Sequence, residues 1–214
     1  MAKLVQKSGY IKSGKASGYM RYIATREGVE KLAGNGAVTK GQRELIQKLL
    51  HDFPDAAELF EYEDYCKTPT LGTASAFITM ALDANLHEID SESGYMQYIA
   101  TRPRVQKHGS HGLFSSSTSV DLASAMSELE AHEGNVWTII YSLRREDAAR
   151  LEFDNADAWR TLLMENAPTL AKSMKISLNN FHWYAAFHDE GHHPHIHMMV
   201  WSDDPKEGFL TRDG

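Results

Sequence analysis

Histidines are concentrated in one short part of the chain, where their spacing could bind a metal ion. Five of the eleven lie within residues 188–197. The runs 181–188 and 195–201 alternate between two faces in the manner of β-strands. The six residues between these runs include a glycine and suit a hairpin connection. Such a hairpin would bring histidines from both runs to one face.

Three of these histidines are expected to converge. His188 would lie across from His195, and His197 across from Ala186, whose small side chain leaves space beside the imidazoles. Three imidazoles on one open-sided face are typical of a catalytic metal site with free coordination positions. The alternative is a purely structural cluster, with the two remaining histidines of the stretch in the loop.

Length and composition are those of a globular protein. The 214 residues suffice for one large domain or two small ones, and the chain is 42% hydrophobic and 24% charged. The first residues lack the long apolar stretch of a signal peptide, and no apolar run approaches the length of a membrane span. Cys66 is the single cysteine, so an internal disulfide is excluded. These features predict a cytoplasmic protein without membrane insertion.

The net charge of −7 conceals a basic N-terminal quarter. Residues 1–50 carry ten Lys and Arg against three Asp and Glu. A basic segment within an acidic chain could form a local phosphate-binding face, and the alternative is an ordinary solvated surface.

The sequence predicts both helices and strands along the length of the chain. Caps, apolar periodicity and breakers indicate the bounds. The sequence predicts strands at 4–12 and 136–142, helices at 18–28, 40–51, 73–84, 121–132 and 155–172, and a loop at 107–119.

One decapeptide occurs twice. Residues 93–102 match residues 17–26 at nine of ten positions, with an offset of 76. Each copy contains a tyrosine pair, Tyr19 with Tyr22 and Tyr95 with Tyr98. The second copy should end sooner as a helix, because a proline follows it. The alternative is a pair of similar amphipathic helices, although nine identities exceed what packing demands.

The histidines, a helix-borne tyrosine and a basic segment together suit one kind of chemistry. A divalent cation held by imidazoles polarises a phosphoryl oxygen. A tyrosine hydroxyl can then attack the phosphorus and form a covalent intermediate. That combination describes the nicking and rejoining of single-stranded DNA.

The sequence resembles the relaxases of conjugative and mobilisable elements, specifically the MobP class and its MobL-like branch from Gram-positive bacteria. In that class a histidine is followed, six positions on, by Pro-His-x-His and apolar residues, as in residues 188–200. The catalytic tyrosine lies on a helix after the first strand, and residues 22–28 fit that motif with one extra residue. A strand followed by an acidic residue forms a second motif, for which residues 136–142 and Glu146 are the counterparts.

The resemblance implies roles for named residues. His188, His195 and His197 would bind Mg²⁺ or Mn²⁺, and Glu146 would orient a ligand histidine. Tyr22 would attack the scissile phosphate, with Tyr98, Tyr19 and Tyr95 as alternatives. Contacts to backbone phosphates would come from Lys7, Lys12, Lys15, Arg21 and Arg26.

The resemblance also implies a fold and partners. The expected fold is α+β, with a central antiparallel sheet flanked by helices, as in HUH-type tyrosine endonucleases. Residues 1–214 would form a single nicking domain, the N-terminal fragment of a longer chain, with 40–92 as a helical insert. The partners would be single-stranded DNA at a transfer origin of a plasmid or integrative element, together with accessory mobilisation and coupling proteins.

Two other enzyme classes share part of the pattern. A replication-initiator HUH nickase carries the same metal motif. His193, His195 and His197 also satisfy the His-x-His-x-His pattern of histidine-triad nucleotide hydrolases, but that interpretation leaves His188 and the repeated decapeptide unexplained. A DNA-binding module with a degenerate site is disfavoured, because all three ligand positions are intact.

Overall fold

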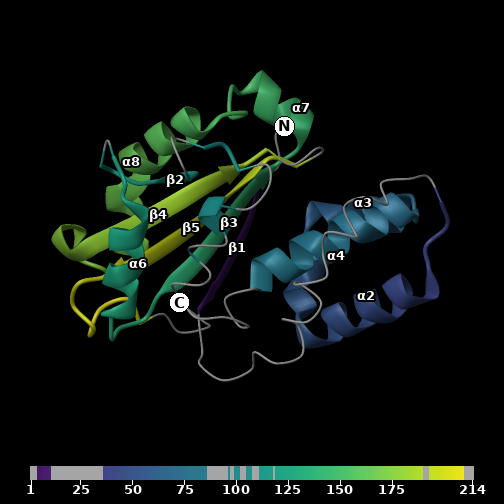
Figure 1. Ribbon diagram of the computed structural model, residues 1–214, viewed down its shortest axis with the longest axis horizontal. Helices are drawn as coiled ribbons and strands as arrows, with labels where there is room; N and C mark the ends of the chain where they lie inside the picture. Colours follow the sequence, from purple (N-terminus) through teal and green to yellow (C-terminus); the bar gives the residue numbers. More distant parts are fainter. Residues whose placement is uncertain are drawn as a thin grey trace. The chain divides into compact units, whose positions relative to one another are not determined.

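The computed structural model describes residues 4–10, 36–85, 96, 99–101, 105–107, 111–117, 119–189 and 193–209. The chain divides into two compact units (Figure 1). The sheet unit comprises Met1–Ile11 and Ser91–Gly214, and the helical unit comprises Lys12–Asp90.

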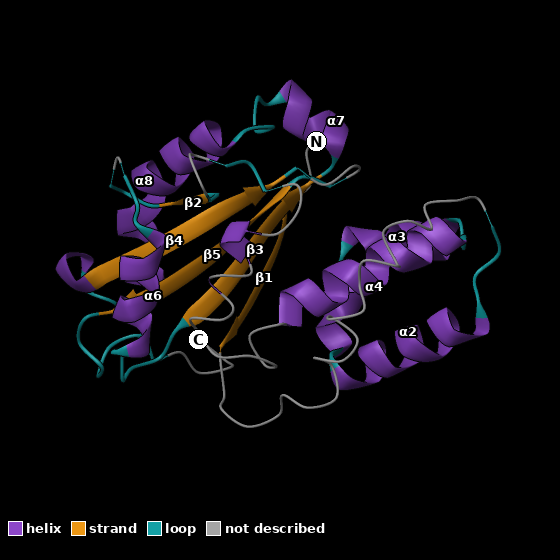
Figure 2. Cartoon of the chain, viewed as in Figure 1, coloured by secondary structure: helices purple, strands orange, loops and turns teal. Residues whose placement is uncertain are grey.

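Five strands of the described residues form one antiparallel sheet in the sheet unit (Figure 2). The strands follow the order β1-β3-β5-β4-β2 across the sheet. Their bounds are β1 Leu4–Tyr10, β2 Leu113–Phe114, β3 Trp137–Leu143, β4 Phe181–His188 and β5 His195–Ser202. The expected α+β fold with a central antiparallel sheet is confirmed, and so are the strand predictions for β1, β3, β4 and β5 within the described residues.

The sheet unit contains several helices, of which α6 Leu122–Glu130 and α8 Ala156–Ser173 begin at side-chain caps. The unit also contains α7 Arg145–Arg150 and the 3₁₀ turn η5 Leu178–Asn180. Asp121 accepts a hydrogen bond from the backbone N–H of Ser124, and Asn155 accepts one from Ala158. These caps fix the starts of α6 and α8 where the sequence predicted them.

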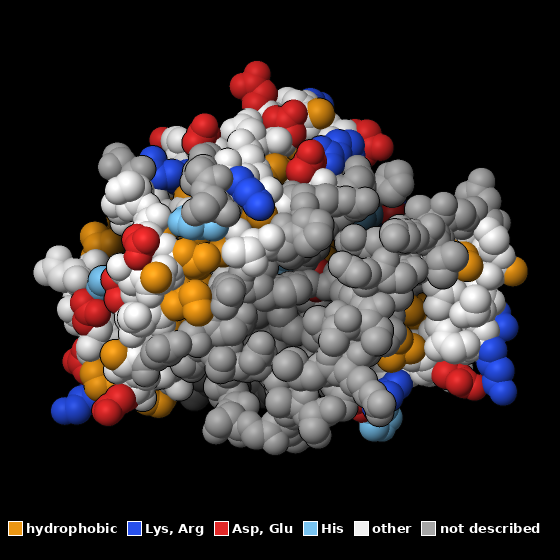
Figure 3. Space-filling model, viewed as in Figure 1, with side chains coloured by type: hydrophobic (Ala, Val, Ile, Leu, Met, Phe, Trp, Pro, Cys, Tyr) orange, Lys and Arg blue, Asp and Glu red, His pale blue; other side chains and the backbone are white. Residues whose placement is uncertain are grey.

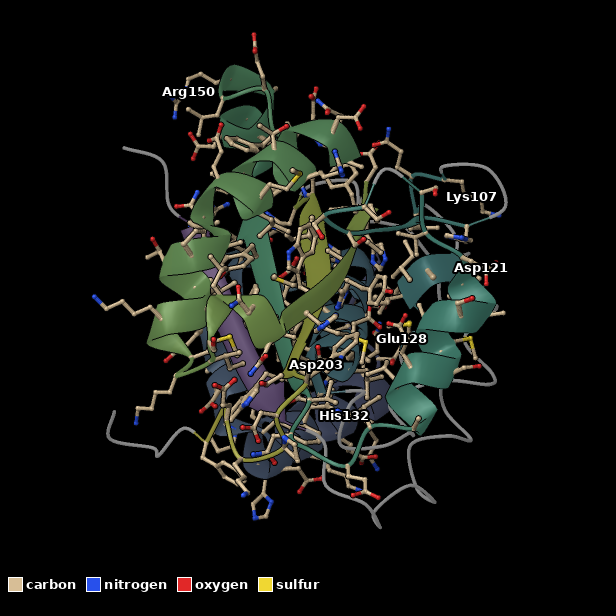
Figure 4. All side chains as sticks on the ribbon, turned by 90° about the vertical axis from the view of Figure 1, so that its left-hand side faces the viewer. Lys107, Asp121, Glu128, His132, Arg150 and Asp203 are labelled. Carbon is tan, nitrogen blue, oxygen red and sulfur yellow. The ribbon has the colours of Figure 1, made fainter. Side chains whose placement is uncertain are left out.

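The two faces of the sheet have different coverings (Figure 4). One face carries the apolar core, in which Trp159 and Leu163 of α8 pack with Trp183, Phe187 and other buried residues of the strands. The opposite face carries the histidines of β4 and β5, and α6 lies over part of it, where Tyr184 of β4 donates to Glu128. The alternation of apolar and polar residues along β4 therefore separates the core from the site, as predicted.

Two sequence predictions in this unit were wrong in detail. The segment 107–119 was expected to be loop, but Leu113–Phe114 forms β2, which pairs with Ala185 and Ala186 at the sheet edge. A two-residue strand is too short for any periodicity to reveal it. The helix expected at 121–132 ends at Glu130, because Ala131 already serves as its C-cap.

The helical unit contains the two helices predicted at 40–51 and 73–84, and between them two helical elements that were not predicted. Its described elements are α2 Lys40–Asp52, η3 Pro54–Glu58, α3 Phe60–Lys67 and α4 Leu71–Asn85. Thr39 and Gln42 form a reciprocal capping box at the start of α2. Pro54 stops α2 as expected, since α2 ends at Asp52 and the proline begins η3.

Some predictions concern residues outside the described part of the chain. The helix expected at 18–28 lies there, as does the end of the second decapeptide copy at 102–104. The helical insert proposed at 40–92 overlaps the helical unit but begins later than it does, and its status as an insert in one nicking domain stays a prediction. No helix among the described residues is long and apolar enough to cross a membrane.

Candidate metal centre

The register of the β4–β5 hairpin brings three imidazoles together. His188 lies opposite His195, and Ala186 lies opposite His197, as the alternation predicted. The ring centroids are 5.2 Å apart for His188 and His195, 4.7 Å for His188 and His197, and 5.0 Å for His195 and His197. One ring nitrogen from each residue lies within 4.8 Å of the other two. Among the described residues, these three histidines form the cluster that could hold a metal ion.

The imidazoles are more enclosed than the sequence suggested. We expected an open-sided face, but His188 and His197 are 0% exposed and His195 is 1% exposed. Burial removes the imidazoles from bulk water. Neutral imidazoles are the form that binds a metal.

In two of the three rings, a hydrogen bond to a backbone carbonyl fixes which nitrogen carries the proton. Nε2 of His188 lies 2.8 Å from the carbonyl oxygen of Ile99, and Nδ1 of His195 lies 3.0 Å from that of His193. Because a carbonyl oxygen can only accept, these two nitrogens must carry the protons. The lone pairs are therefore on Nδ1 of His188 and Nε2 of His195. Such orienting bonds on the far nitrogen are typical of metal-ligating histidines.

The residues of this face fit a divalent cation. Three nitrogen donors leave coordination positions for oxygen ligands, such as those of a phosphate. Ser142 of β3 lies opposite His195, and its side chain is 2% exposed. Its Oγ has no hydrogen-bond partner among the described residues. A buried hydroxyl of this kind costs about 1–3 kcal/mol unless a bound group satisfies it, so its place beside His195 suits a site that takes a polar ligand.

A basic pair lies at the same end of the sheet. Arg144 and Arg145 follow directly after β3, whose last residue, Leu143, donates its N–H to the carbonyl of Pro194 at 3.2 Å. Nη2 of Arg145 forms an ion pair with Oδ1 of Asp189, the residue after His188, at 2.6 Å. These contacts tie the start of α7 to both ends of the hairpin loop. Sequence reasoning assigned no role to the pair, because their proximity to the histidines depends on the β3–β5 pairing.

On the same face, away from His188, His195 and His197, lies an aromatic cluster. The ring of Trp201 stacks on His182 at 5.7 Å and on Tyr184 at 5.5 Å. Burial, and then the hydrogen bond to Glu128, raise the pKa of the Tyr184 hydroxyl to about 12. Burial lowers the pKa of His132, whose ring lies 6.3 Å from that of Trp201. Tyr184 is thus a poor nucleophile, although it shares the face of the imidazoles.

Part of the second decapeptide copy adjoins the metal centre. Met96 and residues 99–101 are helical. Besides the bond from His188 to Ile99, Val105 forms a β-bridge with His188, and Gln106 donates its N–H to the carbonyl of Phe187 at 3.0 Å. Gly112 donates to Ala100 at 2.8 Å, and it has no room for a side chain, because a Cβ there would meet Val105 and the carbonyl of Gln106. The repeat was visible in the sequence, but its place beside His188 was not.

Most of the other predicted site residues lie outside the described part of the chain, and two, Lys7 and Glu146, lie on β1 and α7. Tyr19, Tyr22, Tyr95, Tyr98, Lys12, Lys15, Arg21 and Arg26 lie outside the described residues. Lys7 occupies the β1 position opposite Ile140, which in turn lies opposite His197. Glu146 is exposed in the first turn of α7, and the acceptors described above for His188 and His195 are carbonyls. On the face shown in Figure 3, acidic and basic side chains of the described residues are interspersed.

Comparison with known proteins agrees with this geometry. Neither the curated proteins nor the solved structures contain a significant match to the sequence. The family model described as MobL relaxases matches residues 1–214, the whole chain. With a histidine centre on an antiparallel sheet and a match over its full length, the chain belongs to the MobL relaxases.

Proposed function

We propose that this relaxase nicks and rejoins one strand of DNA at a plasmid or integrative-element transfer origin, through a 5′-phosphotyrosine intermediate. The observation that carries the proposal is the cluster of His188, His195 and His197, with two tautomers set by backbone carbonyls. Membership of the MobL relaxases supports it.

The three histidines would hold Mg²⁺ or Mn²⁺, with His188 binding through Nδ1 and His195 through Nε2. The bound cation would supply Lewis-acid polarisation of the scissile phosphate. The burial of the imidazoles excludes bulk water from their surroundings. The carbonyls of Ile99 and His193 hold the rings in the orientation that binding requires.

Tyr22 is the proposed nucleophile. Its phenolic oxygen attacks the phosphorus, the bond from phosphorus to the 3′-oxygen breaks, and the 5′ end stays on the enzyme. The phenol loses one proton and the departing 3′-oxygen gains one, so the step is balanced in protons. Rejoining is the same step in reverse. Lys7, Lys12, Lys15, Arg21 and Arg26 are proposed to contact backbone phosphates, and Glu146 to orient a ligand histidine.

A second tyrosine has a specific observation in its favour. Tyr98 is covalently joined to Ile99, whose carbonyl accepts the hydrogen bond from His188. Tyr98 is therefore the strongest alternative to Tyr22, ahead of Tyr19 and Tyr95.

Two other functions would use some of the same histidines, and each can be distinguished from this proposal. A replication-initiator nickase would use the same centre on a replication origin, so the DNA site separates the two. A histidine-triad nucleotide hydrolase would need His193 in place of His188. The ligand cluster of the described residues contains His188, and His193 contributes a backbone carbonyl to His195. A metal requirement separates these two, since the triad hydrolases work without one.

The nucleophile can be tested by trapping the covalent intermediate. The protein is mixed with Mn²⁺ and single-stranded DNA from the transfer origin of its own element, and adducts that survive SDS are counted. Wild type should form an adduct and Tyr22→Phe should not. Absence of an adduct in wild type contradicts the proposed function. An adduct that persists in Tyr22→Phe and vanishes in Tyr98→Phe moves the assignment to Tyr98.

The metal centre is tested by a separate comparison. His195→Ala should abolish cleavage while weakening single-stranded DNA binding far less, because phosphate contacts come from elsewhere. Equal losses of cleavage and binding would point to a structural role for His195.

A further inference from the structure

A second concave site lies at the edge of the same sheet. A cavity of about 310 Å³ is lined by residues of β2, the loop after it and the first turns of α8. Its described lining consists of His111, Leu113, Phe114, Ser117, Ser119, Val120, Ala156, Asp157 and Arg160. This volume is at the lower end of small-ligand sites.

The loop that forms one wall is held in place by Arg160. Its Nε donates to the carbonyl of Ser115 at 2.8 Å, and its Nη2 donates to those of Ser116 and Ser117 at 2.8 and 3.2 Å. Ser117 Oγ also donates to the carbonyl of Ser119 at 2.9 Å. These bonds fix the wall before any ligand arrives, which reduces the entropy cost of binding.

The walls combine apolar surface with a paired donor and acceptor. Leu113, Phe114 and Val120 supply flat apolar contact. Three of the five N–H donors of Arg160 are used by the loop, and its two Nη1 donors make no bond to a described residue. Asp157, one helical turn earlier, also lines the cavity, and its carboxylate accepts hydrogen bonds. An apolar slot with an arginine donor and a carboxylate acceptor has the chemistry of a nucleobase pocket.

The cavity is close to the metal centre along the sheet. Leu113 pairs with Ala186, and Ala186 pairs with His197. Two strand spacings separate Leu113 from His197, or about 10 Å. Because α8 lies on the other face of the sheet from the histidines, a single strand whose phosphate lies at the histidines would reach Arg160 and Asp157 by passing round the edge strand β2.

We propose that this cavity binds one unpaired guanine base of the single-stranded DNA substrate, and this rests on the proposed function. Guanine carries an acceptor, O6, beside the N1–H and N2–H₂ donors. Arg160 can donate to O6 while the Asp157 carboxylate accepts both donor groups, and the ring faces lie against the apolar walls. The other three bases do not present two adjacent donors to one carboxylate.

The test compares oligonucleotides that differ at one base. A dodecamer of thymidine serves as the reference probe, and one central thymidine is replaced by dG, dA, dC or an abasic sugar. Affinities are measured in the presence of Mn²⁺. Because the strand can slide until its preferred base enters the cavity, the dG probe should bind about tenfold more tightly than the reference.

Matched variants locate the effect. Ser119→Trp fills the cavity, and Asp157→Ala removes the acceptor, so both should abolish the dG preference while keeping affinity for the reference within about twofold. Ser116→Trp and Glu165→Ala change exposed positions outside the lining and should retain the preference.

Two results would overturn the inference. One is equal affinity of wild type for all five probes, and the other is a dG preference that survives filling of the cavity. A preference for dA or dC that filling removes would refute the choice of guanine. Covalent adduct formation at the transfer origin is measured in parallel. An adduct in wild type together with no dG preference leaves the proposed function standing and removes this inference alone.

Discussion

At the scale of single residues, the metal centre depends on backbone groups as much as on side chains. The carbonyls of Ile99 and His193 set the protonated nitrogens of His188 and His195. Each carbonyl comes from a different part of the chain, one from the second decapeptide copy and one from the hairpin loop. Side-chain substitution cannot remove a carbonyl, so these orienting bonds are robust to mutation at Ile99 and His193 unless the backbone moves.

Tyr184, on the same face as the imidazoles, lies in an environment that does not activate its hydroxyl as a nucleophile. Tyr184 donates to Oε2 of Glu128 at 3.0 Å, and the pKa of Tyr184 is about 12. Burial and the nearby carboxylate both disfavour its phenolate. A nucleophilic tyrosine needs the opposite environment, close to a cation.

The hydroxyl of Tyr184 predicts a pH-dependent contribution to stability. Its folded-state pKa is raised above the unfolded value, so its stabilising effect is complete below about pH 10 and is lost as the pH rises toward 12. Tyr184→Phe should lower the free energy of unfolding by about 1 kcal/mol at pH 8. The gap from wild type should narrow between pH 10 and 12 in denaturant titrations. A gap that stays constant or widens over that range would contradict the assignment.

At the scale of elements, α8 serves both the core and the edge cavity. Its apolar side contributes Trp159 and Leu163 to the core, and Arg160 on the same helix holds the loop after β2. The indole N–H of Trp159 donates to the carbonyl of Phe153 at 2.9 Å, so the helix start is also tied to the chain before it. The position of the cavity therefore depends on where α8 begins.

The N-cap of α8 gives a prediction at this scale. The side chain of Asn155 accepts from the N–H of Ala158 at 2.9 Å. Asn155→Ala should destabilise the sheet unit by about 1 kcal/mol, because that N–H loses its partner. Asn166→Ala is the control on the same helix, at an exposed interior position whose amide donates to the carbonyl of Leu162 at 2.8 Å, and it should be close to neutral because alanine favours the helix. Chemical denaturation of both variants checks this, and equal destabilisation would show that the cap is not the cause.

At the scale of the whole molecule, the sheet unit joins segments that are far apart in sequence. β1, near the N-terminus, pairs with β3, which pairs with β5 of the histidine hairpin. Ile99, Val105 and Gln106 contact the end of β4. A ligand that binds the assembled histidines must therefore stabilise the folded state as a whole.

Metal binding should be visible in thermal unfolding. Mn²⁺ at a hundredfold excess over its dissociation constant should add about 2.7 kcal/mol to the free energy of unfolding, and a chelator should reverse the rise in Tm. His195→Ala should abolish the rise. His182→Ala lies on the same face but outside the ligand cluster, so it should keep the rise. The same rise in His195→Ala as in wild type would place the metal elsewhere.

The sequence by itself determined the local parts of this site. Strand alternation has a period of two, so the hairpin register that pairs His188 with His195 could be read from residues 181–201 alone. The starts of α2, α6 and α8 were predicted to within one residue for a similar reason, since each is set by a cap that bonds within four positions.

Only the tertiary structure decided what surrounds the histidines. The bond from His188 to Ile99 spans 89 residues, and the pairing of Ser142 with His195 spans a strand crossover. β2 and the cavity beside it arise from an edge contact with β4 that no pattern in residues 111–117 reveals. Contacts of this range depend on how whole elements pack, and a sequence pattern with a period of two or 3.6 carries no information about its distant partner. The burial of the imidazoles follows from the same packing, which is why an open face was predicted and an enclosed one is found.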